Sequence, residues 1–559
     1  MRKVLIVTAA VVAAVIFFLL LTLPPRPLAV AAADTALAAR TIAGAFHVHT
    51  VRSDGAGDRA TVANAAAQAG LKFVIITDHG DATRPPDPPA YISGVLCIDG
   101  VEVSTRGGHY VALGIGAAPY PLGGEAEGVV EDVTRLGGFG IAAHPDSART
   151  ELSWTEWGAP VDGLEWVNAD SEWRNETRTR LTRVLFDYLV RPAPALAAML
   201  DRPVSTLARW HGLTARRPVM VIAGHDAHGG LGRSAEYRGA RPSLWAPGVP
   251  SYEASFRSFS TRVVLERALS GEAAPDAATV TAAIRAGQMF TAVDALAAPG
   301  DFAYHAARGP QRLQMGSVST PGPATFVTAA AVPPGARTVL LRNGVEVASA
   351  NGGALRADIP VAQGAYHAEI HLRGAPGNPA VPWILGNPIY FLDPGPPPRA
   401  DVRSEHVPLP AAVSWHVEKD RGSSGSVVTS PAEIAFFYRL RGPGRGSQFA
   451  AAVADLQGRA PAAAAIAFDA TAARPTRLSV QLRYRRGGGA RWGRSVYVDR
   501  TTRRIVVPIE RMRPADQQTG SPPPITAAVS LLFVVDLTNA LPGAANTIRL
   551  SRVGFSPAP

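Results

Sequence analysis

Short apolar segments that alternate with helical segments constrain the fold of residues 41–300 most strongly. Residues 73–77 and 219–223 have the length and composition of strands that are buried on both faces of a sheet. Between strand segments, residues 58–69 have the pattern of a helix that Asp58 caps and Gly70 ends. Residues 125–136 and 174–211 also read as helical, the latter broken at Pro192 and Pro203. Repeated units of this kind predict a parallel α/β barrel.

The remainder of the chain has the pattern of short strands separated by glycine and proline. The pair Asn343-Gly344 between two such strands indicates a β-hairpin, and we expect a small β-sandwich over residues 301–395. A Pro-rich linker over residues 396–411 should be stiff and extended. Residues 412–559 alternate apolar and polar side chains, which predicts an all-β module.

The N-terminus has the pattern of a membrane signal. Arg2 and Lys3 precede an uncharged run over residues 4–23, which as a helix would reach about 30 Å, the thickness of a bilayer core. We expect a transmembrane anchor or signal over residues 1–23, a linker over residues 24–40, and the remainder outside the cytoplasm, periplasmic or extracellular in the bacterial manner. Alternatively, the alanines at 31–33 allow a cleaved signal peptide and a secreted protein.

Composition removes several classes of protein. The single cysteine, Cys97, excludes an intramolecular disulfide and a thiolate zinc cluster. The formal net charge is +10, and the basic surplus lies in the C-terminal part of the chain, after residue 399. We find no nucleic-acid-binding motif, so nucleic acid is not an expected partner.

Side chains that bind metals occur at the ends of the predicted strands. His47 and His49 lie two residues apart on one strand, so their imidazoles share a face. Glu102 is a lone carboxylate in an apolar strand. In a parallel barrel the strand ends meet at one rim, where active sites are built. Imidazole and carboxylate ligands without thiolate suit Zn, Mn or Fe, and a metal site at this rim is therefore predicted.

These motifs resemble those of the polymerase and histidinol phosphatase (PHP) domain. The matching segments are Phe46-His47-Val48-His49-Thr50, Ser53-Asp54-Gly55, Thr77-Asp78-His79, Gly100-Val101-Glu102, Ala143-His144-Pro145 and Asp226-Ala227-His228. The resemblance covers residues 41–300 and implies a distorted seven-stranded (β/α) barrel that holds two or three divalent metal ions. The interval from Glu102 to His109 resembles the exported carbaryl-hydrolase-like and nucleotide-phosphoesterase branches of the family.

The resemblance also implies three metal positions. The first would be held by His47, His49, Glu102 and Asp226, the second by Glu102, His109 and His144, and the third by Asp54, His79 and His228. We expect Glu102, Asp226 and His228 to take part in catalysis as well. Asp54 stands where some members of the family have histidine. His211 and His225 match no ligand position, and Asp78 either orients a ligand or caps a turn.

The predicted metal site indicates hydrolysis. A water between two divalent ions loses its proton near neutral pH and becomes a nucleophile, which suits attack on phosphorus. We therefore expect a phosphoesterase that acts on a small-molecule or headgroup phosphomonoester or phosphodiester. Hydrolysis of a carboxylic or carbamic ester at the same site is the alternative. Arg106, Arg149 and Arg233 lie near ligands in sequence and are candidates for binding phosphate.

The C-terminal module suggests a second function. Residues 477–504 contain nine arginines, interleaved with Tyr484, Trp492 and Tyr497. The strand pattern of this segment is similar to the β jelly roll of carbohydrate-binding domains, and arginine with aromatic side chains suits an anionic glycan. A non-catalytic protein that binds a surface through this module is therefore a further alternative.

Overall fold

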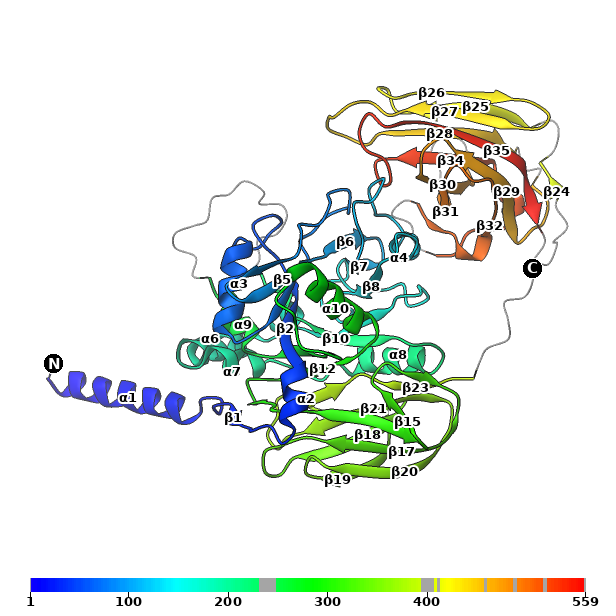
Figure 1. The fold of residues 1–559 in the computed structure, drawn as a ribbon. Helices are drawn as coiled ribbons and strands as arrows, with labels where there is room; N and C mark the ends of the chain where they lie inside the picture. Colours follow the sequence, from blue (N-terminus) through cyan, green and yellow to red (C-terminus); the bar gives the residue numbers. More distant parts are fainter. Residues whose placement is uncertain are drawn as a thin grey trace.

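The computed structural model describes residues 2–230, 248–393, 407–409, 413–456, 460–485, 490–515 and 520–556. Most of the predicted Pro-rich linker, and Arg233 with its neighbours, lie outside the described residues. Figure 1 shows an α/β part, a β-sandwich beside it, and a second β module at the C-terminal end of the chain.

The N-terminal segment forms α1 (Arg2–Leu21), β1 (Leu28–Ala29) and α2 (Thr35–Arg40). Within the described part of the chain, no helix combines the length and apolar character needed to cross a bilayer. The expectation of a transmembrane anchor over residues 1–23 is therefore wrong. The membrane as a partner stays a prediction. Residues 24–40, expected as a linker, contain α2, whose first turn Asp34 caps by accepting a hydrogen bond from the Leu37 amide at 2.9 Å.

The α/β part is built on two sheets. The first contains β2 (Thr41–Val48), β3 (Phe73–Ile76) and β5 (Val95–Asp99), which are mutually parallel, with β4 (Ala90–Ile92) at its edge. The second has the order β10-β9-β8-β7-β6, in which the bounds are β6 (Val101–Thr105), β7 (Gly108–Leu113), β8 (Phe139–Ala142), β9 (Gly163–Asn168) and β10 (Met220–Gly224). Only Gly100 separates β5 from β6, so the two strands follow each other directly along the chain.

Single parallel bridges join these two sheets on both sides. His79 pairs with Glu102 at one junction, and Val48 pairs with Ala227 at the other, so the strands close around a common interior. The strands are not all parallel as expected: β4 is antiparallel to β5, and β7 is antiparallel to both β6 and β8. For β7 the reason is local: β6 and β7 are joined by the two-residue turn Arg106-Gly107, which can only connect antiparallel strands.

Helices cover the outside of the α/β part as the sequence predicted. Asp58 caps α3 by accepting a hydrogen bond from the Thr61 amide at 2.8 Å, and Pro192 begins the helix that follows the predicted break. The helices are α3 (Arg59–Gln68), α4 (Ala126–Arg135), α5 (Ala169–Arg174), α6 (Arg178–Val190), α7 (Pro192–Ala197), α8 (Val204–Thr214), α9 (Tyr252–Phe256) and α10 (Ala273–Arg285).

The β-sandwich shares a sheet with the α/β part. From β2 the first sheet continues through β11 (Ser260–Val264), β12 (Met289–Ala292), β22 (Ile384–Gly386), β21 (Gly364–His371), β23 (Ile389–Phe391) and β16 (Val318–Ser319). The β-sandwich also has a sheet of β15 (Gln311–Gln314), β14 (Ala303–Arg308), β17 (Gly322–Ala329) and β20 (Leu355–Val361), in that order. A hairpin of β18 (Arg337–Arg342) and β19 (Val345–Asn351) completes it. Asn343-Gly344 forms the turn of this hairpin, with positive φ at both residues.

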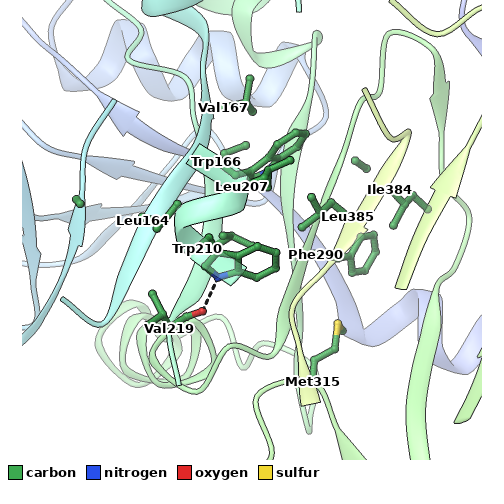
Figure 2. Packing of buried hydrophobic residues seen from close by; sticks show 14 of the residues in the cluster. Leu164, Trp166, Val167, Leu207, Trp210, Val219, Phe290, Met315, Ile384 and Leu385 are labelled. Carbon is green, nitrogen blue, oxygen red and sulfur yellow. Dashed lines mark hydrogen bonds between the residues drawn. The ribbon is translucent and has the colours of Figure 1, made fainter. Parts of the chain in front are cut away.

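The two parts also share one apolar core. Figure 2 shows Trp210 of α8 and Leu164 of β9 in the same cluster as Phe290 of β12 and Leu385 of β22. The Trp210 indole donates a hydrogen bond to the Val219 carbonyl at 2.8 Å, next to β10. Packing therefore continues from residues 41–300 into residues 301–393.

The C-terminal module consists of two antiparallel sheets that face each other, as the alternation predicted. One sheet has the order β25 (Ser414–Lys419), β28 (Phe449–Asp455), β34 (Ser530–Asp536), β30 (Thr476–Arg483), β31 (Arg491–Val498), β33 (Arg513–Pro514). The other has the order β26 (Ser424–Thr429), β27 (Ile434–Arg439), β35 (Ala545–Ser556), β29 (Ala465–Ala472), β32 (Arg503–Pro508), with β24 (Val407–Pro408) against β35. A separate apolar core lies between them.

Arginines of this module contact α4 of the α/β part. The buried Arg477 donates to the Gly128 carbonyl at 2.7 Å and pairs with Asp132 at 2.8 Å, and Arg494 pairs with Glu127 at 2.8 Å. These two of the nine arginines in residues 477–504 therefore bind the protein's own acidic helix. Trp492 of the same stretch is buried in the module's core. A glycan ligand for the module stays a prediction.

Candidate metal centre

All nine predicted ligand side chains lie together where the two sheets meet. β2 and the residue after it supply His47 and His49, and β6 and β7 supply Glu102 and His109. The loops that follow β2, β3, β8 and β10 supply the remaining five: Asp54, His79, His144, Asp226 and His228. The imidazole rings lie close to one another, with ring centroids of His49 and His228 4.4 Å apart and those of His109 and His144 5.0 Å apart.

Glu102 is the centre of this cluster. Its Oε2 lies 3.2 Å from His47 Nε2, 3.3 Å from His49 Nε2 and 3.1 Å from His79 Nδ1. Its other oxygen, Oε1, lies 2.7 Å from His109 Nδ1 and 3.0 Å from His144 Nε2. One carboxylate therefore faces five imidazoles.

Two aspartates continue the cluster on the far side of His49. Asp226 Oδ1 lies 3.2 Å from His49 Nε2 and 3.6 Å from His47 Nε2. Asp54 Oδ2 lies 3.3 Å from His228 Nε2 and 3.6 Å from His79 Nε2. His79 is 27% exposed and Asp54 16%, whereas His49 and Glu102 are buried, so the cluster opens to solvent on the side of His79 and Asp54.

The donor set fits divalent cations. Four groups of three side chains have ligand atoms within 4.8 Å of one another: His47, Glu102 and His144; His47, His49 and Asp226; His49, Asp54 and His228; His49, His79 and Glu102. Five buried polar atoms of the cluster have no hydrogen-bond partner among the described residues: His47 Nε2, His49 Nε2, Asp54 Oδ1, His79 Nδ1 and Glu102 Oε2. Buried polar atoms without partners are costly, and shared cations would satisfy them. His109 contacts Glu102 but belongs to none of the four groups.

The hydrogen bonds of three histidines leave Nε2 free to face the cluster. The Nδ1–H of His47 donates to Glu165 at 2.7 Å, that of His144 to the Leu152 carbonyl at 3.1 Å, and that of His228 to the Asp226 carbonyl at 2.8 Å. A neutral imidazole that donates through Nδ1 presents a lone pair at Nε2. The three rings are therefore oriented as metal ligands before any metal binds.

Glu165 on β9 is a residue of this site that the sequence analysis missed. Its side chain is fully buried and also accepts from the His144 amide at 2.6 Å and from Asn168 Nδ2 at 2.8 Å. Gly224 makes room for it, since a Cβ at that position would lie 1.9 Å from Glu165 Oε1. The signal was present, because Glu165 is a lone carboxylate in an apolar strand, as Glu102 is.

Asp78 holds the loop that carries Ser53 and Asp54. It accepts from the Thr50 amide at 2.8 Å, from the Thr50 hydroxyl at 2.7 Å and from the Ser53 hydroxyl at 2.7 Å. Asp78 was expected either to orient a ligand or to cap a turn. These contacts do both, because the turn that Asp78 caps leads directly to Asp54.

The backbone is strained at three of the ligand positions. His47, His144 and Asp226 adopt positive φ angles of 65°, 29° and 46°, a region that residues with a Cβ rarely occupy. Such strain costs on the order of 1–3 kcal/mol per residue and persists where the surrounding structure imposes it, often at functional sites.

The charges of the cluster shift the pKa values of its members strongly. Burial alone would lower the pKa of His49, but the negative charges of Asp226 and Glu102 beside it outweigh burial and raise it to about 10. Burial opposes ionisation of Glu102, yet the facing imidazoles of His47, His79 and His109 hold the pKa of that carboxyl well below its usual range. The carboxylates of the cluster thus stabilise positive charge beside them, which either protons or metal cations can supply.

The other residues singled out in the sequence lie elsewhere. His225 is buried and contacts the Phe46 and Phe259 carbonyls. His211 stacks on His367 of the β-sandwich. Both histidines therefore make packing contacts away from the cluster. Arg106 pairs with Glu125 at 2.6 Å beside the C-terminal module, and Arg149 is exposed on the loop after β8. Arg233 lies outside the described residues.

Comparison with known proteins gives only distant structural likeness. No family model and no curated protein matches the chain. A two-domain protein from Bacteroides vulgatus, described as containing a predicted PHP-like metal-dependent phosphoesterase, is 13% identical over 65% of this chain and 99% of its own, with a TM-score of 0.29. A family 11 carbohydrate-binding module of Clostridium thermocellum is 15% identical over 28% of this chain and 97% of its own, with a TM-score of 0.22. We therefore infer function from the site alone.

Proposed function

We propose that this chain is a metal-dependent hydrolase that cleaves phosphoesters, with two or three divalent cations held by the nine-residue cluster. The observation that carries the proposal is the sharing of donors between neighbouring groups: His49 belongs to three of the four groups, and His47 and Glu102 each belong to two. Shared donors place cation positions next to one another, which is the arrangement that clamps the oxygens of a phosphoryl group.

The chain's own residues would prepare the site in three ways. Glu165, Leu152 and Asp226 fix the tautomers of three histidines, so their Nε2 atoms need no reorganisation when cations bind. Glu102 offers one oxygen to each side of the cluster, which suits a bridging carboxylate. The partly exposed side at His79 and Asp54 would admit the substrate. When bound, the cations would supply an activated water and stabilise charge that develops on phosphorus.

The test combines metal analysis with assays of two phosphoesters and an aryl carbamate. The purified full chain should contain Mn, Zn or Fe and should hydrolyse bis(4-nitrophenyl) phosphate or 4-nitrophenyl phosphate. A chelator should abolish this activity, and added metal should restore it. Glu102→Gln should lower kcat/KM by roughly 100-fold or more, because it weakens both sides of the cluster, whereas Glu433→Gln on the C-terminal module should have no effect.

Two results would refute the proposal. Turnover of an aryl carbamate without turnover of either phosphoester would assign the site to ester hydrolysis. Full phosphoesterase activity in the Glu102→Gln variant would show that the cluster is not the reaction centre. The location of the protein outside the cytoplasm stays a prediction.

A further inference from the structure

A cavity lined by charged side chains lies at the contact between the α/β part and the C-terminal module. Its volume is about 260 Å3. The α/β part lines it with the β6–β7 turn, the start of α4 and Glu156, and the C-terminal module lines it with β31, β33 and the residues before β33. Neither part could form this cavity alone. We call it the seam cavity.

Four arginines and three glutamates surround the seam cavity. They are Arg106, Arg494, Arg511, Arg513, Glu125, Glu127 and Glu156. The guanidinium of Arg106 pairs with Glu125 at 2.6 Å, that of Arg494 with Glu127 at 2.8 Å, that of Arg511 with Glu127 at 3.4 Å, and that of Arg513 with Glu156 at 3.5 Å. Each arginine of the cavity thus pairs with one of its glutamates.

The pairs of Arg511 and Arg513 leave hydrogen-bonding capacity unused. Both side chains are about half exposed, at 58% and 49%, and both pairs are long. A guanidinium carries five N–H donors, and these contacts engage at most two of them. Donors and carboxylate acceptors therefore face the cavity together.

Paired charges select the chemistry of the ligand. An anion in the cavity would lie beside three glutamates and a cation beside four arginines, so either charge meets repulsion. A neutral ligand that carries many hydroxyl groups meets no such cost, because each hydroxyl both donates to a carboxylate and accepts from a guanidinium. The volume is slightly below the roughly 300 Å3 at which pockets for drug-sized ligands begin, so it suits one sugar ring or a polyol of similar size.

The seam cavity and the metal centre share residues of one hairpin. Arg106 and Gly107 form the turn between β6 and β7, and the same two strands carry Glu102 and His109. At about 3.3 Å per residue, the turn lies on the order of 10 Å from the cluster. A substrate with its phosphoryl group at the cluster could therefore place a group one sugar further along in the cavity.

We propose that the seam cavity binds the non-reacting, hydroxyl-rich portion of the substrate, which makes the substrate class a glycosyl or polyol phosphoester. The proposal rests on the proposed function for the role of the phosphoryl group, but the binding of a neutral sugar does not depend on it. The C-terminal module thereby contributes Arg494, Arg511 and Arg513 to substrate specificity.

The test measures sugar binding separately from hydrolysis, using the full chain. Binding of trehalose, maltose and cellobiose is measured by calorimetry with and without added Mn. We expect at least one of these to bind, and we expect the double variant Arg511→Ala/Arg513→Ala to weaken that binding at least tenfold. Arg549→Ala, an exposed arginine on the other sheet of the module, is the matched control and should bind as the unmodified chain does.

A kinetic comparison links binding to substrate choice. With trehalose 6-phosphate the double variant should raise KM at least tenfold with little change in kcat, whereas its kinetics with 4-nitrophenyl phosphate should not change. If none of the three sugars binds, or if the double variant binds them normally, the seam cavity proposal is wrong. Sugar binding that depends on Arg511 and Arg513, in a chain that cleaves no phosphoester, would instead refute the proposed function. The seam cavity would then still be a sugar-binding site.

Discussion

Glu165 shows how one side chain connects the two halves of the candidate centre. It accepts from the His47 ring and from the His144 main chain, and both of these residues have strained backbones. Glu165 is in none of the groups that could hold a cation. Its contribution is therefore to position two ligands, and the loss of such an outer partner commonly costs 10–100-fold in metal affinity or activity.

Substitution Glu165→Gln tests this positioning role. The amide keeps the size of the side chain but removes the charge that fixes the His47 tautomer, so we expect metal affinity to fall about 10–100-fold. Excess metal should restore much of the activity, which would not happen if the fold were lost. Metal titration followed by activity is the measurement.

Glu172→Gln is the matched control for that substitution. Glu172 is a buried carboxyl on α5, and burial raises its pKa to about 8. It is therefore largely protonated at neutral pH, and glutamine resembles that form. Normal metal affinity in Glu165→Gln, or an equal loss in Glu172→Gln, would contradict the positioning role.

At the residue scale, ligand types could be predicted because strand ends converge. Histidine and carboxylate side chains after apolar strands are recognisable without knowledge of the neighbours they meet. The tautomers could not be predicted, because the acceptor for His144 is the carbonyl of Leu152, which no residue-type pattern marks. The surroundings of Arg106 could not be predicted either, since its partner Glu125 at the start of α4 also contacts Ser495, 370 residues away along the chain.

At the level of elements, α4 connects the C-terminal module to the metal centre. Its outer face binds Arg477 and Arg494, and it packs on β7 and β8, the strands that lead to His109 and His144. The helix itself was predicted from the sequence, over residues 125–136. The contact of its acidic face with the C-terminal module was not predicted, because the arginines that cover this face come from a distant segment.

Substitution Arg477→Ala should release the C-terminal module from α4. The guanidinium is buried and contacts Gly128, Asp132 and Glu131, and removal of one partner from such a buried network costs up to about 3–5 kcal/mol. We expect a larger radius of gyration in solution scattering and a module that melts independently. Hydrolysis of 4-nitrophenyl phosphate should persist, because no metal ligand is touched.

Arg552→Ala provides the comparison for that experiment. Arg552 is 67% exposed and pairs with Asp469 of the same sheet, which is not the sheet that carries Arg477. Its loss should therefore leave the radius of gyration unchanged. If Arg477→Ala is as compact as the unmodified chain and melts as it does, then Arg477 is not what holds the module to α4.

At the scale of the whole molecule, the β-sandwich supports the strand that leads to Asp226 and His228. Asn387 accepts from the Val221 amide and donates to the Val221 carbonyl, both at 2.8 Å. The Tyr390 hydroxyl accepts from the Val219 amide at 3.2 Å and donates to its carbonyl at 2.9 Å. Side chains of residues 301–393 thus supply hydrogen-bond partners to the main-chain groups at this edge of β10. Sequence pattern located the change to β-structure near residue 300, but it could not show that the sheet and the core continue across that point.

Two truncations test this dependence. A chain of residues 1–393 keeps the shared sheet and should fold, bind metal and hydrolyse small phosphoesters, because the C-terminal module adds no metal ligand. A chain of residues 1–300 removes the partners of the Val219 amide and of the Val221 amide and carbonyl, at about 1–3 kcal/mol for each buried group. It also exposes the edge of β12 that pairs with β22. We expect this shorter chain to be insoluble or to bind no metal, as judged by circular dichroism and metal content. A folded 1–300 chain with bound metal would show that the α/β part is an independent domain and that the β-sandwich does not support the site.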